Sequence, residues 1–196
     1  MDYKKTQAIL GNVDIYLIDQ ILKNRYVTTD VILDAGCGEG RNLKWFYAND
    51  YSIYGIDKDL ARITEAIKNC PKFANNFKVA DLDSLPFGEN VFHHIICSAV
   101  LHFAQSETHF KGMFTELIRV LKPNGTLFIR MASNIGLDGN APVVQDSVNK
   151  QNGMYYLTRE RIQSLMKMYH LELVEPIKTT NVQDVRAMTT LVFKKV

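Results

Sequence analysis

The ten residues VILDAGCGEG, at positions 31–40, have the clearest chemical potential in this 196-residue chain. An apolar run ends at Asp34, and glycine then occupies every second position as far as Gly40. This order is typical of a buried strand that feeds a tight turn and then a helix, where backbone N–H groups can approach a ligand. Asp57 ends a second strand-like run, SIYGID. An acid at about this spacing binds a ribose hydroxyl in nucleotide-binding α/β folds, so the pattern predicts an adenosine-containing ligand.

Two common phosphate-binding loops do not fit the residues of this turn. The dinucleotide fingerprint GxGxxG needs glycine at its sixth position, where this chain has Arg41. An arginine there would crowd both the pyrophosphate and the contact between helix and strand. A phosphate loop needs Gly-Lys followed by Ser or Thr, and no such sequence follows. S-adenosylmethionine is the remaining common adenosine ligand of this architecture, with a nicotinamide-dependent dehydrogenase as an alternative.

Alternating strand-like and helix-like segments must position this loop. Strands are expected at 31–34, 52–56, 77–80, 93–98 and 126–131, and helices at 13–24, 41–49, 59–69, 110–121 and after the capping residue Thr158. The residues 122–125 predict a turn. Two last β runs, 171–179 and 187–195, predict an antiparallel pair. The alternation predicts a mostly parallel sheet that is covered on both faces and binds its ligand at the carboxyl ends of the strands.

The composition favours an ordinary globular domain. Lys and Arg number 23 against 21 Asp and Glu, and a formal net charge of +2 offers no electrostatic case for a nucleic-acid partner. No stretch approaches 18 apolar residues, and the first ten residues lack a signal-peptide core. Three cysteines without CxxC spacing suit a reducing compartment. We expect a single cytoplasmic domain over 1–196, monomeric or dimeric, with no membrane partner.

Five segments, in order, resemble the motifs of the class I S-adenosylmethionine-dependent methyltransferases: LDAGCGEG, YGID, VADLDSLPF, HHIICSAVLHF and LIRVLKPNGTLFI. The resemblance covers nearly all of the chain. It implies a Rossmann-like, doubly wound α/β fold with a seven-stranded, mostly parallel sheet and an antiparallel C-terminal hairpin strand. It also implies methyl transfer from S-adenosylmethionine, leaving S-adenosylhomocysteine, to an O, N or S nucleophile of a small-molecule acceptor.

The same resemblance implies which residues bind the cofactor. The amides of the glycine loop would face the methionyl part, and Asp34 would anchor that end. Asp57 would accept from ribose hydroxyls, Asp81 would accept from the adenine amine, and Leu82 would contribute a backbone amide. An Asx turn is the competing interpretation for Asp81. The full set is Asp34, Gly36, Cys37, Gly38, Arg41, Asp57, Lys58, Asp81, Leu82 and Ser98.

His102, four residues after Ser98, is the candidate general base. An imidazole titrates near neutral pH and could accept a proton from the acceptor. The competing interpretation is that His102 closes the pocket or caps the next helix. His93 and His94 lack carboxylate or cysteine partners at a metal-binding spacing, so we expect them to be exposed and expect no metal site.

Acceptor specificity is expected to depend on two segments that close over the strand ends. These are residues 1–16, within an N-terminal helical cap over 1–30, and a lid or substrate loop, 132–156. Candidate substrate residues are Tyr16, Phe103, Arg130, Asn134 and Tyr155, and core packing is the competing interpretation for the aromatic ones.

Two further functions stay open at this point. The string GEGRN resembles the tellurite-resistance and thiol methyltransferase branch of the family, whose acceptors need no general base. A methyltransferase-like module that binds the cofactor without turnover is an alternative of a different class.

Overall fold

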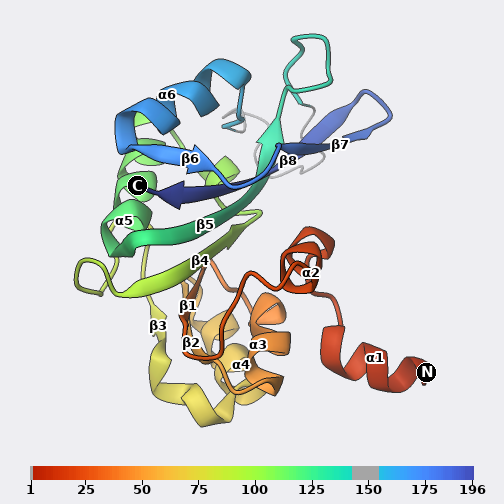
Figure 1. Ribbon diagram of the computed structural model, residues 1–196, viewed down its shortest axis with the longest axis vertical. Coiled ribbons are helices and arrows are strands. Elements are labelled where there is room, and N and C mark those ends of the chain that lie inside the picture. Colours follow the sequence, from red (N-terminus) through yellow and green to blue (C-terminus); the bar gives the residue numbers. More distant parts are fainter. Residues whose placement is uncertain (1, 143–154) are drawn as a thin grey trace.

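The computed structural model describes residues 2–142 and 155–196. An eight-stranded sheet organises them in the order β3-β2-β1-β4-β5-β8-β6, and β7 also pairs with β8 (Figure 1). The strands are β1 (Val31–Ala35), β2 (Ser52–Asp57), β3 (Phe77–Val79), β4 (Phe92–Ser98), β5 (Leu121–Ser133), β6 (Leu171–Leu173), β7 (Lys178–Val182) and β8 (Arg186–Lys195). The helices are α1 (Tyr3–Leu10), α2 (Ile15–Leu22), α3 (Lys44–Ala48), α4 (Leu60–Asn69), α5 (Glu107–Val120) and α6 (Arg159–Tyr169). Three short 3₁₀ segments, η1 (Arg41–Leu43), η2 (Pro71–Asn76) and η3 (Leu101–Phe103), complete the set.

The predicted sheet is confirmed in class, with one more strand than expected. Strands β1 to β5 are parallel, and β8 runs antiparallel to β5, β6 and β7. The run expected at 171–179 divides because Leu173 pairs with Phe193 and Lys178 pairs with Thr190, so residues 174–177 stand opposite only 191–192. Pro176 lies in this bulge, where its missing N–H costs no ladder hydrogen bond.

The turn expected at 122–125 is an irregularity near the start of β5. The register with β4 shifts between the pairs Phe92–Leu121 and His94–Thr126, and Asn124 has a left-handed φ of 63°. Beyond this point β5 stays in register with β4 as far as Arg130, opposite Ser98, and then continues to Ser133. The long strand therefore brings the carboxyl ends of β4 and β5 to the same edge of the sheet.

Helices cover both faces of the sheet (Figure 1). On β5, Leu127, Ile129 and Met131 pack into the core shared with α5 and α6, whereas Phe128 packs into the core shared with α2, α3 and α4. Alternate residues of a strand point to opposite faces. Arg130, two residues after Phe128, therefore lies on the α2 side.

Helix α2 is fixed to the sheet by its cap and by charges. Asp14 caps it by accepting a hydrogen bond from the Tyr16 amide at 3.0 Å, and Leu17 is fully buried. Glu175, in the bulge between β6 and β7, accepts hydrogen bonds from Lys23 and Arg25 at 2.6 and 2.9 Å. By contrast α1 contributes no buried residue and projects from the body of the molecule, where it contacts α3 (Figure 1).

The two histidines at the start of β4 are not exposed, which corrects the prediction. His94 lies between the Asp30 carboxylate, at 2.9 Å, and the Thr126 hydroxyl, at 2.7 Å. His93 accepts a hydrogen bond from the Val31 amide at 2.9 Å. Within residues 2–142 and 155–196, no group of three or more His, Cys, Asp or Glu side chains is placed to hold a metal ion. The same residues include no helix that is long and apolar enough to span a bilayer.

Candidate cofactor and acceptor site

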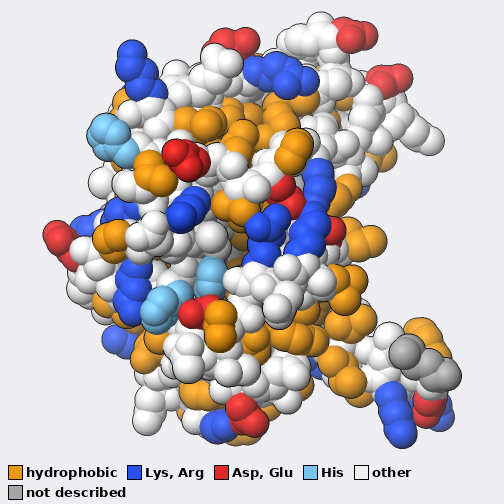
Figure 2. All heavy atoms as spheres, viewed as in Figure 1, with side chains coloured by type: hydrophobic (Ala, Val, Ile, Leu, Met, Phe, Trp, Pro, Cys, Tyr) orange, Lys and Arg blue, Asp and Glu red, His pale blue; other side chains and the backbone are white. Residues whose placement is uncertain are grey.

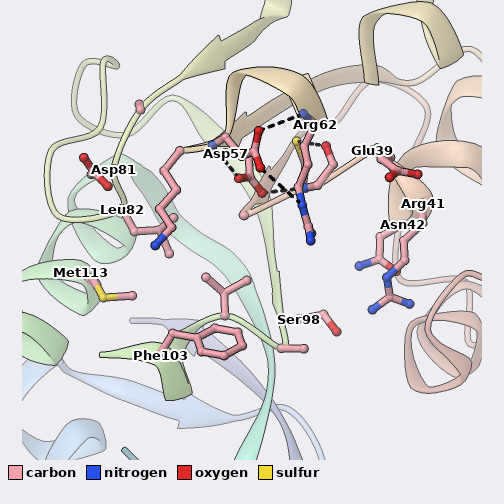
Figure 3. Close-up of a pocket in the computed structure, with 18 of the residues that line it drawn as sticks. Glu39, Arg41, Asn42, Asp57, Arg62, Asp81, Leu82, Ser98, Phe103 and Met113 are labelled. Carbon is pink, nitrogen blue, oxygen red and sulfur yellow. Dashed lines mark hydrogen bonds and ion pairs between the residues drawn. The ribbon is translucent and has the colours of Figure 1, made fainter. Parts of the chain in front are cut away.

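A cavity of about 610 Å³ opens where the first four strands end. Its lining includes residues 36–39 after β1, 57–59 after β2, 80–82 after β3 and 98–100 after β4. Figure 3 shows Leu82 and Met113 at one end, Arg41 and Asn42 at the other, and Ser98 between them. Small-ligand pockets have volumes of roughly 300–1,000 Å³, so this cavity is large enough for a nucleoside-sized ligand.

The glycine loop is shaped for close contact with other backbone and side-chain atoms. Gly36 has a φ of 80°, and a Cβ added to it would lie 2.4 Å from Cγ2 of Val100. The expectation that the loop amides face the ligand is wrong for three of them. The amides of Gly36 and Cys37 both donate to the carbonyl of Ile56 at 2.8 Å, and the amide of Gly38 donates to Asp57 at 2.9 Å. These hydrogen bonds tie the loop to β2, and the lack of a side chain at Gly36 lets the loop pack closely against Val100.

Asp57 braces the loop from the end of β2. Its Oδ2 accepts the hydrogen bond from the Gly38 amide at 2.9 Å, and its Oδ1 accepts one from the Asp59 amide at 3.0 Å. A carboxylate has about four lone-pair sites, so Asp57 can still accept from two ribose hydroxyls. This half-buried side chain lines the cavity, as the prediction of a ribose ligand requires.

Asp34 lies at the end of β1 but does not line the cavity. Its side chain is buried, and neither carboxylate oxygen has a hydrogen-bond partner among the described residues. Burial raises the pKa of Asp34 to about 7, Arg41 opposes that shift, and the carboxylates of Asp57 and Asp14 add to it. A buried acid without a donor is rare, and a bridging water or the ammonium group of a bound ligand would satisfy it. This unpartnered carboxyl fits the methionyl end of S-adenosylmethionine.

At the other end of the cavity, exposed Asp81 and buried Leu82 follow β3. Met113 and His109 of α5 also line the cavity, and the sequence analysis missed both as site residues. The helical apolar spacing assigned Met113 to the core, and nothing in the sequence connected α5 with the loop after β3. The other lining residues that were missed are Asn12, Glu39, Asn42, Asp59, Arg62, Ala80, Ala99 and Val100.

Of the predicted substrate residues, only Phe103 lines the cavity, with 54% of its surface exposed. Tyr155 instead stacks on Phe110, with ring centroids 4.2 Å apart, and its hydroxyl donates to Glu107 at 2.9 Å. Asn134 follows β5, and its amide donates to the carbonyl of Leu157 at 3.0 Å. Part of the lid expected at 132–156 falls outside the described residues, so its role stays a prediction.

His102, the candidate base, is buried behind the cavity wall, with 6% of its surface exposed. Burial lowers its pKa to about 4, and the nearby Arg130 guanidinium acts in the same direction. The imidazole is therefore neutral at pH 7 and is a weaker base than a free histidine. A catalytic role for His102 stays a prediction that this geometry does not favour.

Four side chains meet beside Ser98, on the α2 side of the cavity. The Ser98 hydroxyl donates to Oδ2 of Asp14 at 2.8 Å, and Nη1 of Arg130 lies 3.5 Å from the same oxygen. The Arg130 guanidinium lies over the Tyr16 ring, 5.5 Å from its centroid, and the Tyr16 hydroxyl is bonded to Thr180. Around the hollow in Figure 2, basic, acidic and histidine side chains are mixed, so neither sign of charge dominates this face.

Comparison with known proteins assigns residues 33–129 to the family model described as a methyltransferase domain. A tRNA (carboxymethyluridine(34)-5-O)-methyltransferase of Arabidopsis thaliana is 37% identical over 99 residues, which cover 50% of this chain and 23% of that protein. An uncharacterized methyltransferase of Bacillus subtilis, YodH, is 34% identical over 101 residues, which cover 49% of this chain and 40% of that protein. The chain thus spans less than half the length of these two relatives.

A solved structure extends the comparison to the whole fold. The geranyl diphosphate C-methyltransferase of Streptomyces coelicolor, in complex with S-adenosyl-L-homocysteine, superposes with a TM-score of 0.73 at 13% identity and covers 98% of this chain and 79% of its own. Its sequence is distant, so the likeness concerns the fold. The matched family model, the sheet order and the glycine loop tied to Asp57 show that the chain belongs to the class I S-adenosylmethionine-dependent methyltransferases.

Proposed function

We propose that the chain transfers the methyl group of S-adenosylmethionine to a small-molecule acceptor. The observation that carries this proposal is one cavity that joins the glycine loop, Asp57 and Asp81, with the unpartnered carboxyl of Asp34 behind it. The bound cofactor supplies an activated methyl group on a sulfonium sulfur. The protein's contribution is then to align the acceptor and to exclude water.

We assign the cofactor contacts to the residues at the strand ends. Asp57 would accept from the ribose hydroxyls and Asp81 from the adenine amine, with Leu82 and Met113 as apolar neighbours of the base. Asp34 would meet the methionyl ammonium, directly or through water. That contact would favour the ionised carboxylate and so offset the cost of burying it.

We infer that the acceptor atom, O, N or S, is already nucleophilic at neutral pH. His102, the candidate base, is buried, neutral and outside the cavity lining. A general base is required only where the acceptor keeps its proton at working pH. A thiolate or chalcogen oxyanion, as the GEGRN string suggested, would meet this condition.

The N-terminal residues support the proposed cap over the site. Asn12 lines the cavity, and its carbonyl accepts a hydrogen bond from Nη1 of Arg41 at 2.9 Å. Asp14 completes the polar group beside Ser98. We also propose a cytoplasmic location, since Cys37, Cys70 and Cys97 are all free thiols.

A nucleoside of tRNA is the second candidate acceptor, because the Arabidopsis relative is a tRNA (carboxymethyluridine(34)-5-O)-methyltransferase. That relative matches only half of this chain, and the net charge of +2 gives little general attraction for RNA. These two facts support a small-molecule acceptor over a nucleoside of tRNA.

Calorimetry with S-adenosylmethionine and S-adenosylhomocysteine tests the cofactor assignment, with saturable binding of both expected. Turnover is then measured as S-adenosylhomocysteine release with small amines, thiols, phenols and carboxylic acids, and with tRNA that carries carboxymethyluridine at position 34. Binding without product in every arm would favour the module without turnover. Product with tRNA alone would favour the second candidate. Saturable NADH binding, with no binding of either sulfur nucleoside, would refute the proposal in favour of a dehydrogenase.

A further inference from the structure

The buried polar atoms that lack partners among the described residues fall into distinct places. The two oxygens of Asp34 belong to the proposed cofactor end. Nε of Arg130, Oγ1 of Thr190 and Nδ1 of His102 form a second set. Native proteins leave few buried polar groups without a partner, so a local concentration of them calls for an explanation.

This second set lies around the end of β5. Arg130 and Thr190 stand directly opposite each other in the β5–β8 ladder, so their side chains share the α2 face of the sheet. His102 lies close enough for the Arg130 charge to lower its pKa. Arg130 is also the register partner of Ser98 on β4, and Ser98 lines the cavity. Arg130 and Thr190 therefore lie on the α2 side of the sheet, behind Ser98 of the cavity lining.

The bonding capacity of Arg130 is largely unused. A guanidinium carries five N–H donors in a planar fork. Within the described residues, Arg130 has one carboxylate neighbour, Asp14, at 3.5 Å through Nη1 alone. Oδ2 of Asp14 already accepts from Ser98, and its Oδ1 accepts from the Tyr16 amide. The Asp14 carboxylate thus partly offsets the cost of burying the Arg130 charge, but it leaves most of the guanidinium donors without an acceptor among the described residues.

Lys178, a second cation on the same sheet face, differs from Arg130 because carboxylates of the protein pair with its charge. Lys178 stands opposite Thr190 in the β7–β8 ladder, and its ammonium contacts Asp19 at 2.5 Å and Glu175 at 2.7 Å. Lys178 therefore has no need of an external anion, whereas Arg130 can form two parallel hydrogen bonds with one.

The charges around Arg130 select a monoanion. The Asp14 carboxylate is beside it, and the neutral imidazole of His102 adds no positive charge at pH 7. A dianionic phosphate would meet one cation and one anion, whereas a carboxylate brings a single charge and the flat shape that pairs with a guanidinium. The Thr190 hydroxyl adds a donor on the same face.

We infer that Arg130 holds the carboxylate of an acidic acceptor, so that the substrates of this site are small carboxylic acids. This inference rests on the proposed methyl transfer and names its substrate class. The carboxylate is an anchor for the acceptor. Tyr16, whose ring lies under the guanidinium, fixes the plane of the fork.

The test uses the protein saturated with S-adenosylhomocysteine and the probes benzoate and benzamide, which have similar shapes and differ in charge. The Nε–Hε signal of Arg130 is followed by NMR, and the affinity is fitted from its shift. We expect saturable binding of benzoate and none of benzamide. Arg130→Gln is expected to weaken benzoate binding at least tenfold. Arg130→Lys keeps the positive charge but loses the planar pair of donors, so its benzoate affinity is expected to lie between those of the wild type and Arg130→Gln.

Arg186→Gln is the matched control, because it removes the same charge from an exposed position at the start of β8. In the variants, benzoate affinity is measured by calorimetry, and S-adenosylhomocysteine affinity is expected to match the wild type. Wild-type protein that binds S-adenosylhomocysteine but not benzoate, or benzamide as tightly as benzoate, would overturn the inference. The same holds if folded Arg130→Gln or Arg130→Lys protein binds benzoate like the wild type. Failure of the wild type to bind S-adenosylhomocysteine would instead refute the proposed function.

Discussion

Replacing Gly36 with alanine tests the steric fit of the loop after β1. The Gly36 φ of 80° lies in the left-handed region, and an added Cβ would stand 2.4 and 2.9 Å from the two methyl groups of Val100. The backbone strain costs about 1–2 kcal/mol. Overpacking against Val100 costs a further amount of about 1–3 kcal/mol. We therefore expect Gly36→Ala to lower the free energy of unfolding by roughly 2–5 kcal/mol, a large part of a typical 5–15 kcal/mol.

A double-mutant cycle separates the two contributions. Val100→Ala removes both methyl groups and leaves Cβ 3.2 Å from the added atom, so Gly36→Ala in that background should cost little more than the backbone strain. The two substitutions together should then cost about 1–3 kcal/mol less than the sum of their separate costs. Gly139→Ala is the matched control, because Gly139 has a φ of 83° and nothing within 4 Å of the added Cβ.

Urea unfolding provides the assay, with Trp45, the one tryptophan in the chain, as the fluorescent probe. The steric reasoning fails if Gly36→Ala costs no more than Gly139→Ala. It also fails if Val100→Ala gives no relief to Gly36→Ala.

Three further predictions concern the site. Asp57→Ala should weaken S-adenosylhomocysteine binding at least tenfold, about 1.4 kcal/mol, because a charge-assisted hydrogen-bond acceptor is lost. Calorimetry checks this, with the exposed Asp50→Ala variant as the control. Unchanged affinity in a folded Asp57→Ala variant would contradict the ribose assignment. Asp34→Asn tests the buried carboxyl. Burial raises the pKa of Asp34 to about 7, so the native state holds this proton more tightly than the unfolded chain. The unfolding free energy of the wild type should therefore fall as pH rises from about 4 to about 7, by up to about 1.4 kcal/mol per pH unit. Urea titrations of Asp34→Asn should lack that slope. Identical pH profiles for the wild type and Asp34→Asn would contradict the raised pKa of Asp34. His102→Ala should leave S-adenosylhomocysteine affinity within about twofold, and a larger loss by calorimetry would place His102 at the cofactor end.

The sequence was most informative where local pattern and sheet geometry agree. Short apolar runs ending in Asp34, Asp57 and Ser98 predicted parallel strands, and the carboxyl ends of parallel strands meet at one edge. This geometry, with the family resemblance that added residues 58 and 82, predicted a common site for residues 36–38, 57–58, 81–82 and 98, and all of them line one cavity.

The acceptor side was harder to predict because its contacts link distant parts of the chain. Nothing in the local sequence around Asp14 indicates that it accepts from Ser98, 84 residues later. Arg130 and Tyr16 were named as single candidates, but their contact depends on how α2 docks on the sheet. The use of the Gly36 and Cys37 amides was also hidden, since a glycine-rich turn looks the same whether its donors face a ligand or the carbonyl of Ile56.

The position of β8 has a consequence for how this chain matures. β8 follows β6 and β7 in the sequence, yet it lies between β5 and β6 in the sheet. Until β8 has been synthesised and inserted, the long edge of β5 offers unpaired N–H and C=O groups to any other strand. Nascent or truncated chains that lack β8 should therefore aggregate through β5. Chaperones should bind the chain most strongly just before β8 inserts between β5 and β6.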